Sequence, residues 1–557
     1  MYLPLARPSG PPSPRSNHIE SAFHPRATVM GASLIWGLPA LPEGGYRRPV
    51  HTLTDDGPPP ERAGVVIVGG GFAGLEVARR LADHGCLDVV VLEGGPAAEL
   101  RHTNVTHDPD AAVELWLDPT RDPYHQRPWT SARAPHFQGN AGVRARLGGR
   151  SLYWYGVTLP MDAWALAGPG WPTAVVHDLT TSWRGGPGLY ERQATELGLS
   201  WLDGTVAAPG AARQLGGFTL RPTPRAVRPH PDQAGRWSAY SPLDHWRDPA
   251  TGAATDPAPR VRIFADTRVR RVCQTGGRAT GVIAVDGRTT APHRIAADAV
   301  VLAAGTVENS RLAIQALTTA GALAVPKLGG LADHLVQGFL VRIATAGRLP
   351  LRPGSYYLQF PAARSILFLS LWRVSRSEAV LDVKINGECP PSGESYVACQ
   401  PQPAYPWPTV VYAGLSGEGR RVLAAQRTVL DDVWAALAVA FGLAGQLSFG
   451  PYDDPPSTNV AVLPRNRDRR PLGVPQTWSS PLGAEDHEGG TLPLGSVLSE
   501  NHEFRHLPGL YAAGPATFPR IGAANPSLTT MALARRLAAV LADRLPASAG
   551  TTSGAPA

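Results

Sequence analysis

The sequence predicts an α/β fold with two domains: one assembled from discontinuous segments of the chain, and one of α+β type with a mixed or antiparallel sheet. Three observations support this prediction. The 557 residues exceed the size at which one hydrophobic core usually divides. A strand, a helix and a second strand follow one another between residues 65 and 92. Strand-like apolar runs then return between residues 261 and 302.

The hydrophobic pattern places the individual elements. Val65–Val68 is expected to be a buried strand, Leu75–His84 a helix by its spacing, and Val89–Leu92 a second buried strand. Residues 109–143 are expected to be mostly loop because aromatic residues and prolines interrupt any period. Further elements are expected as a helix at Leu189–Gly198, strands at Val261–Phe264, Val269–Val272, Thr280–Val285, Ala299–Leu302, Ser365–Trp372 and Ala379–Ile385, and helices at Arg421–Phe441 and Ser527–Leu545.

The charge balance argues against a nucleic-acid partner. The chain has 52 basic and 45 acidic residues, and almost all the basic ones are arginine, since Lys327 and Lys384 are its only lysines. The densest basic group, between Arg465 and Arg470, lies among Pro and Asp and is expected to be a solvated loop.

Cysteine usage and hydropathy exclude other classes of protein. Four scattered cysteines without a CxxC pair predict neither a disulfide framework nor a metal site. The apolar stretch Met30–Leu41 is short and broken by Gly and Pro, and no run approaches the roughly 18 apolar residues of a membrane-spanning helix. A cytoplasmic protein without a membrane partner is therefore expected, and its oligomeric state stays open.

A glycine-rich turn follows the first strand. Gly69-Gly70-Gly71-Phe72-Ala73-Gly74 fits GxGxxG, and Glu93 stands at the end of the next strand. In such a turn Gly69 permits the tight bend, Gly71 lets a pyrophosphate approach the backbone, and Gly74 lets helix and strand pack closely. The helix N-terminus attracts the phosphates, and Glu93 would accept hydrogen bonds from a ribose. A Rossmann-like dinucleotide site is preferred over a structural turn because all four features occur in order. The motif alone does not distinguish FAD from NAD, but no second GxGxxG is present.

Motifs farther along the chain carry a family resemblance. The strand at Ala299–Leu302 leads into Ala303-Ala304-Gly305-Thr306-Val307-Glu308-Asn309-Ser310-Arg311. Near the end, His487-Glu488-Gly489-Gly490-Thr491, Leu510-Tyr511-Ala512-Ala513-Gly514 and Asn525-Pro526 follow in order. This series resembles the glucose–methanol–choline (GMC) oxidoreductases, FAD enzymes that oxidise alcohols and sugars. The segment Gly330-Leu331-Ala332-Asp333-His334 also resembles a recurring loop of that family.

The resemblance implies which residues bind the cofactor. Gly148, Gly149 and Ser151 look like the family's second glycine motif beside the isoalloxazine, and Val269 stands where the family places a valine against the adenine. The residues expected to bind FAD are Gly69, Gly71, Phe72, Ala73, Gly74, Glu93, Gly148, Gly149, Ser151, Tyr153, Trp154, Val269, Ala304, Gly305, Gly514 and Pro526.

Domain limits follow from this set. A Rossmann-like FAD-binding domain is assigned to residues 61–160, 255–330 and 485–545, and a substrate-binding domain with a mixed or antiparallel sheet to residues 161–254 and 331–484. Residues 1–60 are expected to form a Pro/Arg-rich arm, and residues 546–557 a disordered tail. Residues 331–484 match the family poorly, so the resemblance does not identify the substrate.

By their positions in the family motifs, His487 and Asn525 are expected to face the flavin N5. Hydride transfer from an alcohol carbon requires the hydroxyl proton to leave, and an imidazole that is neutral near pH 7 suits that proton. His487 is therefore assigned as general base rather than as a structural histidine, and flavin reduction is expected to rise with pH as the imidazole loses its proton. Asn525 is expected to orient the substrate oxygen, with a capping role as the alternative. Pro526 starts the closing helix, whose dipole would favour the anionic reduced flavin.

Two departures from the family concern the flavin. Tyr153 occupies the position at which some members attach FAD covalently through histidine, so FAD is expected to be non-covalent. Trp154 stands where many members have Asn.

The resemblance implies oxidation of a CH–OH group to a carbonyl on a small-molecule alcohol, with sugars and hydroxylated secondary metabolites as the first classes to test. Oxygen or another acceptor would regenerate the flavin. A flavin-retaining lyase or decarboxylase on the same fold is one alternative. A non-enzymatic flavin-binding protein is another, against which the His487–Asn525 pair argues.

Overall fold

The computed structural model describes residues 54–55, 57–86, 88–107, 111, 114–115, 118, 121–251, 261–345, 349–452 and 471–545. Most of the expected arm over residues 1–60 lies outside the described residues. The basic group between Arg465 and Arg470 and the tail over residues 546–557 also lie outside them.

The first of two seven-stranded sheets begins with a β-α-β unit. Strand β1 (Arg62–Val68) leads into α1 (Phe72–Asp83) and then into β2 (Val89–Leu92), which pairs with β1 in parallel. Strand β17 (Pro292–Leu302) pairs in parallel with the other side of β1, so the distant strand returns beside the first. The sheet order is β14 (Val261–Phe264), β2, β1, β17, β16 (Arg278–Asp286) and β15 (Thr267–Thr275), with β26 (Leu510–Ala512) on β17.

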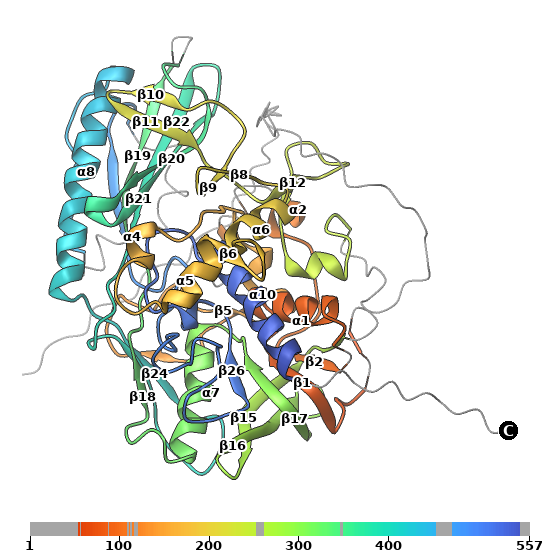
Figure 1. Cartoon of the computed structure of the whole chain (residues 1–557). Helices are drawn as coiled ribbons and strands as arrows, with labels where there is room; N and C mark the ends of the chain where they lie inside the picture. Colours follow the sequence, from red (N-terminus) through yellow and green to blue (C-terminus); the bar gives the residue numbers. More distant parts are fainter. Residues whose placement is uncertain are drawn as a thin grey trace, which may run out of the picture.

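Hydrophobicity explains why this unit forms where it does. The four residues of β2 are all apolar and fully buried, as a strand covered on both faces requires. Helix α10 (Ser527–Arg544) packs along α1 (Figure 1) and buries most of its length. The glycine-rich loop after β1 is therefore held between a buried sheet and a pair of packed helices.

The second seven-stranded sheet is antiparallel throughout. One long helix, α8 (Gly417–Phe441), runs along it (Figure 1) and packs Trp434 edge-on against Phe339, with ring centroids 5.4 Å apart. The sheet order is β10 (Arg213–Leu215), β11 (Phe218–Pro222), β20 (Gly354–Phe360), β21 (Ser365–Arg373), β22 (Glu378–Gly387), β19 (Leu335–Ala344) and β25 (Gln476–Ser480).

The remaining elements lie outside the two large sheets, and four of their strands form a separate four-stranded sheet. They are α2 (Thr103–Thr106), β3 (His125–Gln126), β4 (Thr130–Ser131), β5 (Val143–Arg144), η2 (Gly149–Leu152), α4 (Ala163–Leu166), α5 (Thr173–Thr180), β6 (Ser182–Trp183), β7 (Gly186–Pro187), α6 (Leu189–Glu196), β8 (Ser200–Leu202), β9 (Thr205–Ala207), β12 (Val227–Pro229), β13 (Trp237–Ala239), η3 (Pro242–His245), α7 (Thr306–Thr319), β18 (Lys327–Gly329), η4 (Pro361–Ala363), β23 (Tyr396–Cys399), β24 (Thr409–Tyr412) and η7 (Pro515–Thr517).

The predicted fold class is confirmed, and the elements differ from the prediction mainly at their ends. The helix expected from Leu75 begins at Phe72, directly after Gly71. Strand β17 begins at Pro292, N-terminal of the expected start at Ala299. The prediction missed this first half because its buried and exposed residues alternate and form no continuous apolar run. The sequence prediction missed β19 and β20, which lie inside the second sheet. Gln337 and Gly338 interrupt the apolar pattern of β19, although both are buried.

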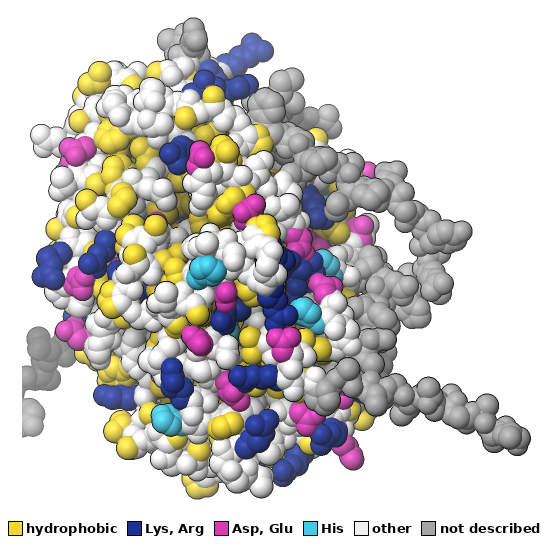
Figure 2. Space-filling view, viewed as in Figure 1, with side chains coloured by type: hydrophobic (Ala, Val, Ile, Leu, Met, Phe, Trp, Pro, Cys, Tyr) yellow, Lys and Arg dark blue, Asp and Glu magenta, His cyan; other side chains and the backbone are white. Residues whose placement is uncertain are grey.

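The surface shows side chains of both charges. On the face drawn in Figure 2, basic and acidic side chains are interspersed, and hydrophobic side chains gather mainly in its upper half. Among the described helices, none combines the length and the apolar character that crossing a membrane requires.

Candidate active site

A cavity of about 1350 Å³ is lined by both large sheets. The first sheet contributes Val68 and Val269, and the second contributes Leu340, Tyr356 and Val380. The sequence-predicted residues that line this cavity are Gly69, Gly71, Phe72, Ala73, Glu93, Gly149, Tyr153, Trp154, Val269, Ala304, Gly305, His487, Gly514, Asn525 and Pro526. One space therefore brings together the glycine loop, the second glycine segment and the start of the last helix.

The glycine loop has two positions where a side chain cannot fit and one where it would enter the cavity. Gly69 has φ +107°, and a Cβ there would lie 2.6 Å from the carbonyl oxygen of Ala303. A Cβ on Gly74 would lie 2.0 Å from the carbonyl oxygen of Gly69. At Gly71, by contrast, a Cβ would meet no protein atom within 4 Å. Gly71 therefore leaves the backbone at the start of α1 open to the cavity, as the approach of a pyrophosphate requires.

Glu93 is buried at the end of β2 and lines the same cavity. Its two carboxyl oxygens accept the backbone N–H groups of Gly70 and Gly95, each at 2.8 Å. Burial raises its pKa to about 7, and the two N–H bonds oppose this shift. The carboxyl group is thus fixed by the loop itself, with lone pairs remaining for a ribose hydroxyl.

Three predicted cofactor residues do not line the cavity. Gly74 packs behind the loop against Gly69, which agrees with its expected part in helix–strand packing. Gly148 takes a left-handed turn with φ +90° before η2. Ser151 corrects the prediction, because its buried hydroxyl bonds the carbonyl of Gly148 and the hydroxyl of Ser241, each at 2.6 Å. Its side chain therefore holds η2 in place and does not reach the cofactor space.

Tyr153 and Trp154 line the cavity with their polar atoms already engaged. Arg146 donates to the Tyr153 hydroxyl at 3.2 Å, and this hydroxyl donates to Asp122, also at 3.2 Å. Burial raises the pKa of Tyr153 above its ordinary value. The Trp154 indole donates to the carbonyl of Tyr240 at 2.8 Å and packs edge-on against Phe72, 5.2 Å between centroids. Both rings are thus held as fixed apolar walls.

The two expected catalytic residues touch. The side-chain amide nitrogen of Asn525 lies 3.2 Å from His487 Nε2, and His487 Nδ1 lies 3.0 Å from Nδ1 of a second histidine, His334. His334 also bonds the backbone of Gly522. Its Nδ1 faces His487, so the bond to Gly522 is made by Nε2–H, and its Nδ1 must accept. His487 therefore carries its proton on Nδ1, which leaves Nε2 to accept the side-chain N–H of Asn525.

Asp333 ties together the segments that carry the two histidines. Its carboxylate accepts the backbone N–H groups of His334 at 2.8 Å and Gly483 at 2.6 Å. An antiparallel bridge between Ala332 and Gly489 joins the same segments. The motif at residues 330–334 thus serves to place His334 against His487.

Burial and charge keep both imidazoles neutral. Burial, followed by the positive charges of Lys384 and Arg150, lowers the pKa of His487 to about 3. Burial and the neighbouring His487 hold the pKa of His334 well below its ordinary value. The expectation that the imidazole titrates near neutral pH is therefore wrong, because no local pattern indicates that two histidines are buried side by side.

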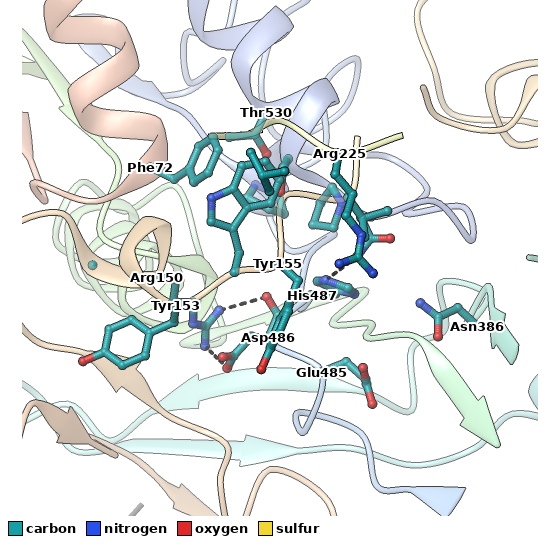
Figure 3. Close-up of a pocket in the computed structure, with 18 of the residues that line it drawn as sticks. Phe72, Arg150, Tyr153, Tyr155, Arg225, Asn386, Glu485, Asp486, His487 and Thr530 are labelled. Atoms are coloured by element: carbon teal, nitrogen blue, oxygen red, sulfur yellow. Dashed lines mark hydrogen bonds and ion pairs between the residues drawn. The ribbon is translucent and has the colours of Figure 1, made fainter. Parts of the chain in front are cut away.

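Charged and polar side chains surround His487 (Figure 3). Arg150 forms ion pairs with Asp486 at 3.0 Å and with Glu488 at 2.7 Å, on either side of His487 in the chain. Lys384 pairs with Glu485, whose other oxygen accepts the Ser480 hydroxyl at 2.8 Å. The side-chain oxygens of Asn525 and Asn386 are buried and, within the described part of the chain, have no hydrogen-bond partner.

Two family models match this chain. Residues 429–534, which include His487 and Asn525, match the model described as GMC oxidoreductase. The C-terminal part of the chain is a GMC oxidoreductase domain. Residues 189–357 match an FAD binding domain, which begins after the glycine loop and includes β14 to β17. These matches confirm the family resemblance and FAD as the cofactor. The open backbone at Gly71, the carboxyl group of Glu93 and the volume of the cavity fit a bound FAD.

Two relatives of this chain bear the same name. A C-glycoside 3-oxidase of Arthrobacter globiformis is 27% identical over 352 residues, which are 59% of this chain and 61% of that protein. A C-glycoside 3-oxidase of Microbacterium trichothecenolyticum is 42% identical over 73 residues, 12% of this chain and 14% of that protein. The matched region thus spans less than two thirds of either relative.

Solved structures of low identity share the fold of this chain. The pyridoxine 4-oxidase of Mesorbium loti is 19% identical, with a TM-score of 0.52 over 86% of this chain and 98% of that one. A variant formate oxidase of Aspergillus oryzae is 15% identical, with a TM-score of 0.57 over 87% of this chain and 98% of that one. At these identities the likeness concerns the fold alone.

Sequence reasoning missed several residues of the site. His334 lay within a noted motif, but the motif gave no role for its side chain. Asn386, Lys384 and Arg225 line the cavity from segments without a motif, and only their arrangement in the second sheet and its connections brings them there.

Proposed function

We propose that this protein oxidises a hydroxyl-bearing carbon of a glycoside to a carbonyl. The observation that carries the proposal is the unprotonated Nε2 of His487, which lies 3.2 Å from the side-chain amide nitrogen of Asn525. Both groups line the cavity that holds the dinucleotide loop. Nε2 can accept the hydroxyl proton, and the second N–H of the Asn525 amide can donate to the substrate oxygen as that proton leaves.

Each residue has a distinct task in this proposal. His487 Nε2 receives the hydroxyl proton. The hydrogen bond from His487 Nδ1 to His334 keeps the ring in the tautomer in which Nε2 is unprotonated. Asn525 orients the substrate oxygen.

FAD supplies the acceptor for the hydride that leaves the carbinol carbon. Gly71 and the start of α1 would receive its pyrophosphate, and Glu93 its ribose. Tyr153 has a phenol, already hydrogen-bonded to Arg146 and Asp122, at the position where family members with covalently attached FAD have a histidine. We therefore propose that the flavin is held without a covalent bond, and that oxygen or another small-molecule acceptor reoxidises it.

The opposite wall of the cavity favours a substrate with several hydroxyl groups. Asn386 presents a buried oxygen that has no hydrogen-bond partner among the described residues, and the Lys384–Glu485 pair presents a donor and an acceptor together. Such groups suit a sugar better than a simple alcohol. The two relatives named C-glycoside 3-oxidases support the same class.

Anaerobic bleaching of the flavin tests the proposal. The holoenzyme should be reduced by at least one C- or O-glycoside in a panel that also includes free sugars and simple alcohols. Conversion of a substrate without bleaching would instead indicate a lyase, and no conversion of any panel member would contradict the proposed oxidation.

A further inference from the structure

Arg225 lines the cavity and has no carboxylate partner in the part of the chain that the structure describes. It lies between β11 and β12, and an antiparallel bridge to Val157 fixes its backbone. One terminal nitrogen donates to the Ser355 hydroxyl at 3.2 Å, and the buried Nε has no acceptor. Among the described residues, no carboxylate oxygen lies within 4 Å of this guanidinium. Figure 3 shows Arg225 on the same side of the cavity as His487 and Asn386.

Two other arginines of the cavity are neutralised by the protein itself. Arg144 pairs with Asp122 at 3.0 Å, and Arg311 pairs with Glu308 at 2.8 Å. Arg225 differs from them, because burial lowers its pKa and only the phenol of Tyr155 acts in the opposite direction. A guanidinium stays charged in proteins, so its burial is costly until an anion arrives.

The surroundings of Arg225 add positive charge and aromatic surface. The cavity walls made by residues 198–227 and 340–386 also carry the cations Arg213, Arg352 and Lys384, of which Lys384 is paired with Glu485. Burial raises the pKa of Tyr155 to about 12, so its hydroxyl stays protonated and can donate. Its ring lies 5.7 Å from that of Trp237, which also lines the cavity.

We propose that Arg225, assisted by the Tyr155 hydroxyl, binds a carboxylate on the substrate, so that the preferred substrates are acidic glycosides. This inference rests on the proposed function, because it names the class of glycoside that the site selects. The anchor belongs to the substrate rather than to FAD, since Ser355, which holds Arg225, lies on β20 of the second sheet. The carboxylate can belong to the sugar, as in a uronic acid, or to the aglycone.

Pairs of substrates that differ only in charge test the anchor. Glucuronate against glucuronamide examines a carboxylate on the sugar, and 4-carboxyphenyl against 4-carbamoylphenyl glucoside examines one on the aglycone. For at least one pair, kcat/KM should favour the acid by about 10- to 100-fold, the usual effect of a hydrogen bond to a charged group. Equal rates within both pairs would overturn the proposal.

Variants then assign the preference to Arg225. Arg225→Gln should bring the acid-to-amide ratio close to one by slowing the acid alone, and Arg225→Lys should retain part of the preference. Arg221→Gln is the matched control, because Arg221 is an exposed arginine of neighbouring β11 that does not line the cavity. It should leave both rates unchanged. Equal slowing of acid and amide in Arg225→Gln, or loss of FAD from it, would contradict a substrate anchor.

A binding measurement separates failure of this inference from failure of the proposed function. The wild-type holoenzyme should bind benzoate at least about tenfold more tightly than benzamide, followed by the change in flavin absorbance. Arg225→Gln should lose this difference. If no glycoside is oxidised but benzoate binds in this way, the anchor stands and the proposed reaction fails. If glycosides are oxidised but benzoate and benzamide bind alike, the anchor fails alone.

Discussion

The two walls of the cavity are built on different principles. The wall formed by the first sheet meets the cofactor largely with backbone: Gly69 and Gly74 are too close to other backbone atoms to bear a side chain, and Gly71 leaves its N–H region open. The wall formed by the second sheet meets the substrate with side chains such as Asn386 and Arg225. A backbone site constrains residues within one short segment, whereas a side-chain site can be altered one residue at a time.

The largest effect is expected from the backbone wall. Gly74→Ala should abolish FAD binding and destabilise the protein by roughly 1–3 kcal/mol or more, because its Cβ would lie 2.0 Å from the carbonyl oxygen of Gly69. Gly71→Ala should fold normally and weaken FAD binding by about tenfold or more, since its Cβ enters only the cavity. Flavin content and thermal melting measure both. Gly393→Ala, where a Cβ also meets nothing within 4 Å, is the control. Full flavin content in Gly74→Ala would contradict this view of the loop.

Removal of the proton acceptor should slow flavin reduction strongly and leave FAD binding unchanged. His487→Ala should purify yellow and slow flavin reduction by substrate by about 10²- to 10⁴-fold. Stopped-flow absorbance under anaerobic conditions gives the rate. Reduction at the wild-type rate would place the base elsewhere in the cavity.

Asn525→Ala should do less damage, because it removes one orienting contact and leaves the proton acceptor in place. A loss of roughly 1–3 kcal/mol in transition-state stabilisation is expected, seen in kcat/KM for the same glycoside. A loss equal to that of His487→Ala would mean that the two residues act as one unit.

The smallest effect is expected from pH. A His487 pKa lowered to about 3 keeps the imidazole neutral from pH 5 to 8, so the rate of flavin reduction should be flat in this window. Only below it should the rate fall, as the ring gains a proton and can no longer accept one. Reduction rates across a pH series measure this directly, and a rise centred near pH 6.5 would show that the ring titrates like an exposed histidine.

The contrast between the walls also explains what could be predicted from sequence. The glycine loop, Glu93 and the His487–Asn525 pair were predictable because each belongs to a contiguous motif whose spacing reflects local geometry. The contact between His334 and His487 spans 153 residues and depends on the bridge between Ala332 and Gly489, so no local pattern announces it. Burial decides the pKa of His487, and burial is a property of the assembled fold.

Ser151 shows the opposite error. A motif placed it beside the cofactor, but its hydroxyl turns to Ser241, 90 residues away, and serves the packing of η2. Membership of a motif predicted its backbone position and not the direction of its side chain.

Anaerobic single turnover of the wild-type holoenzyme with one equivalent of a glycoside tests the central claim most directly. The account predicts that each mole of flavin bleached yields one mole of ketone, detected by mass spectrometry as a loss of two hydrogen atoms from the substrate. Acid denaturation afterwards should release all the flavin from the polypeptide. Product formed without bleaching, or bleaching without a carbonyl product, would contradict hydride transfer from a sugar carbon in this cavity.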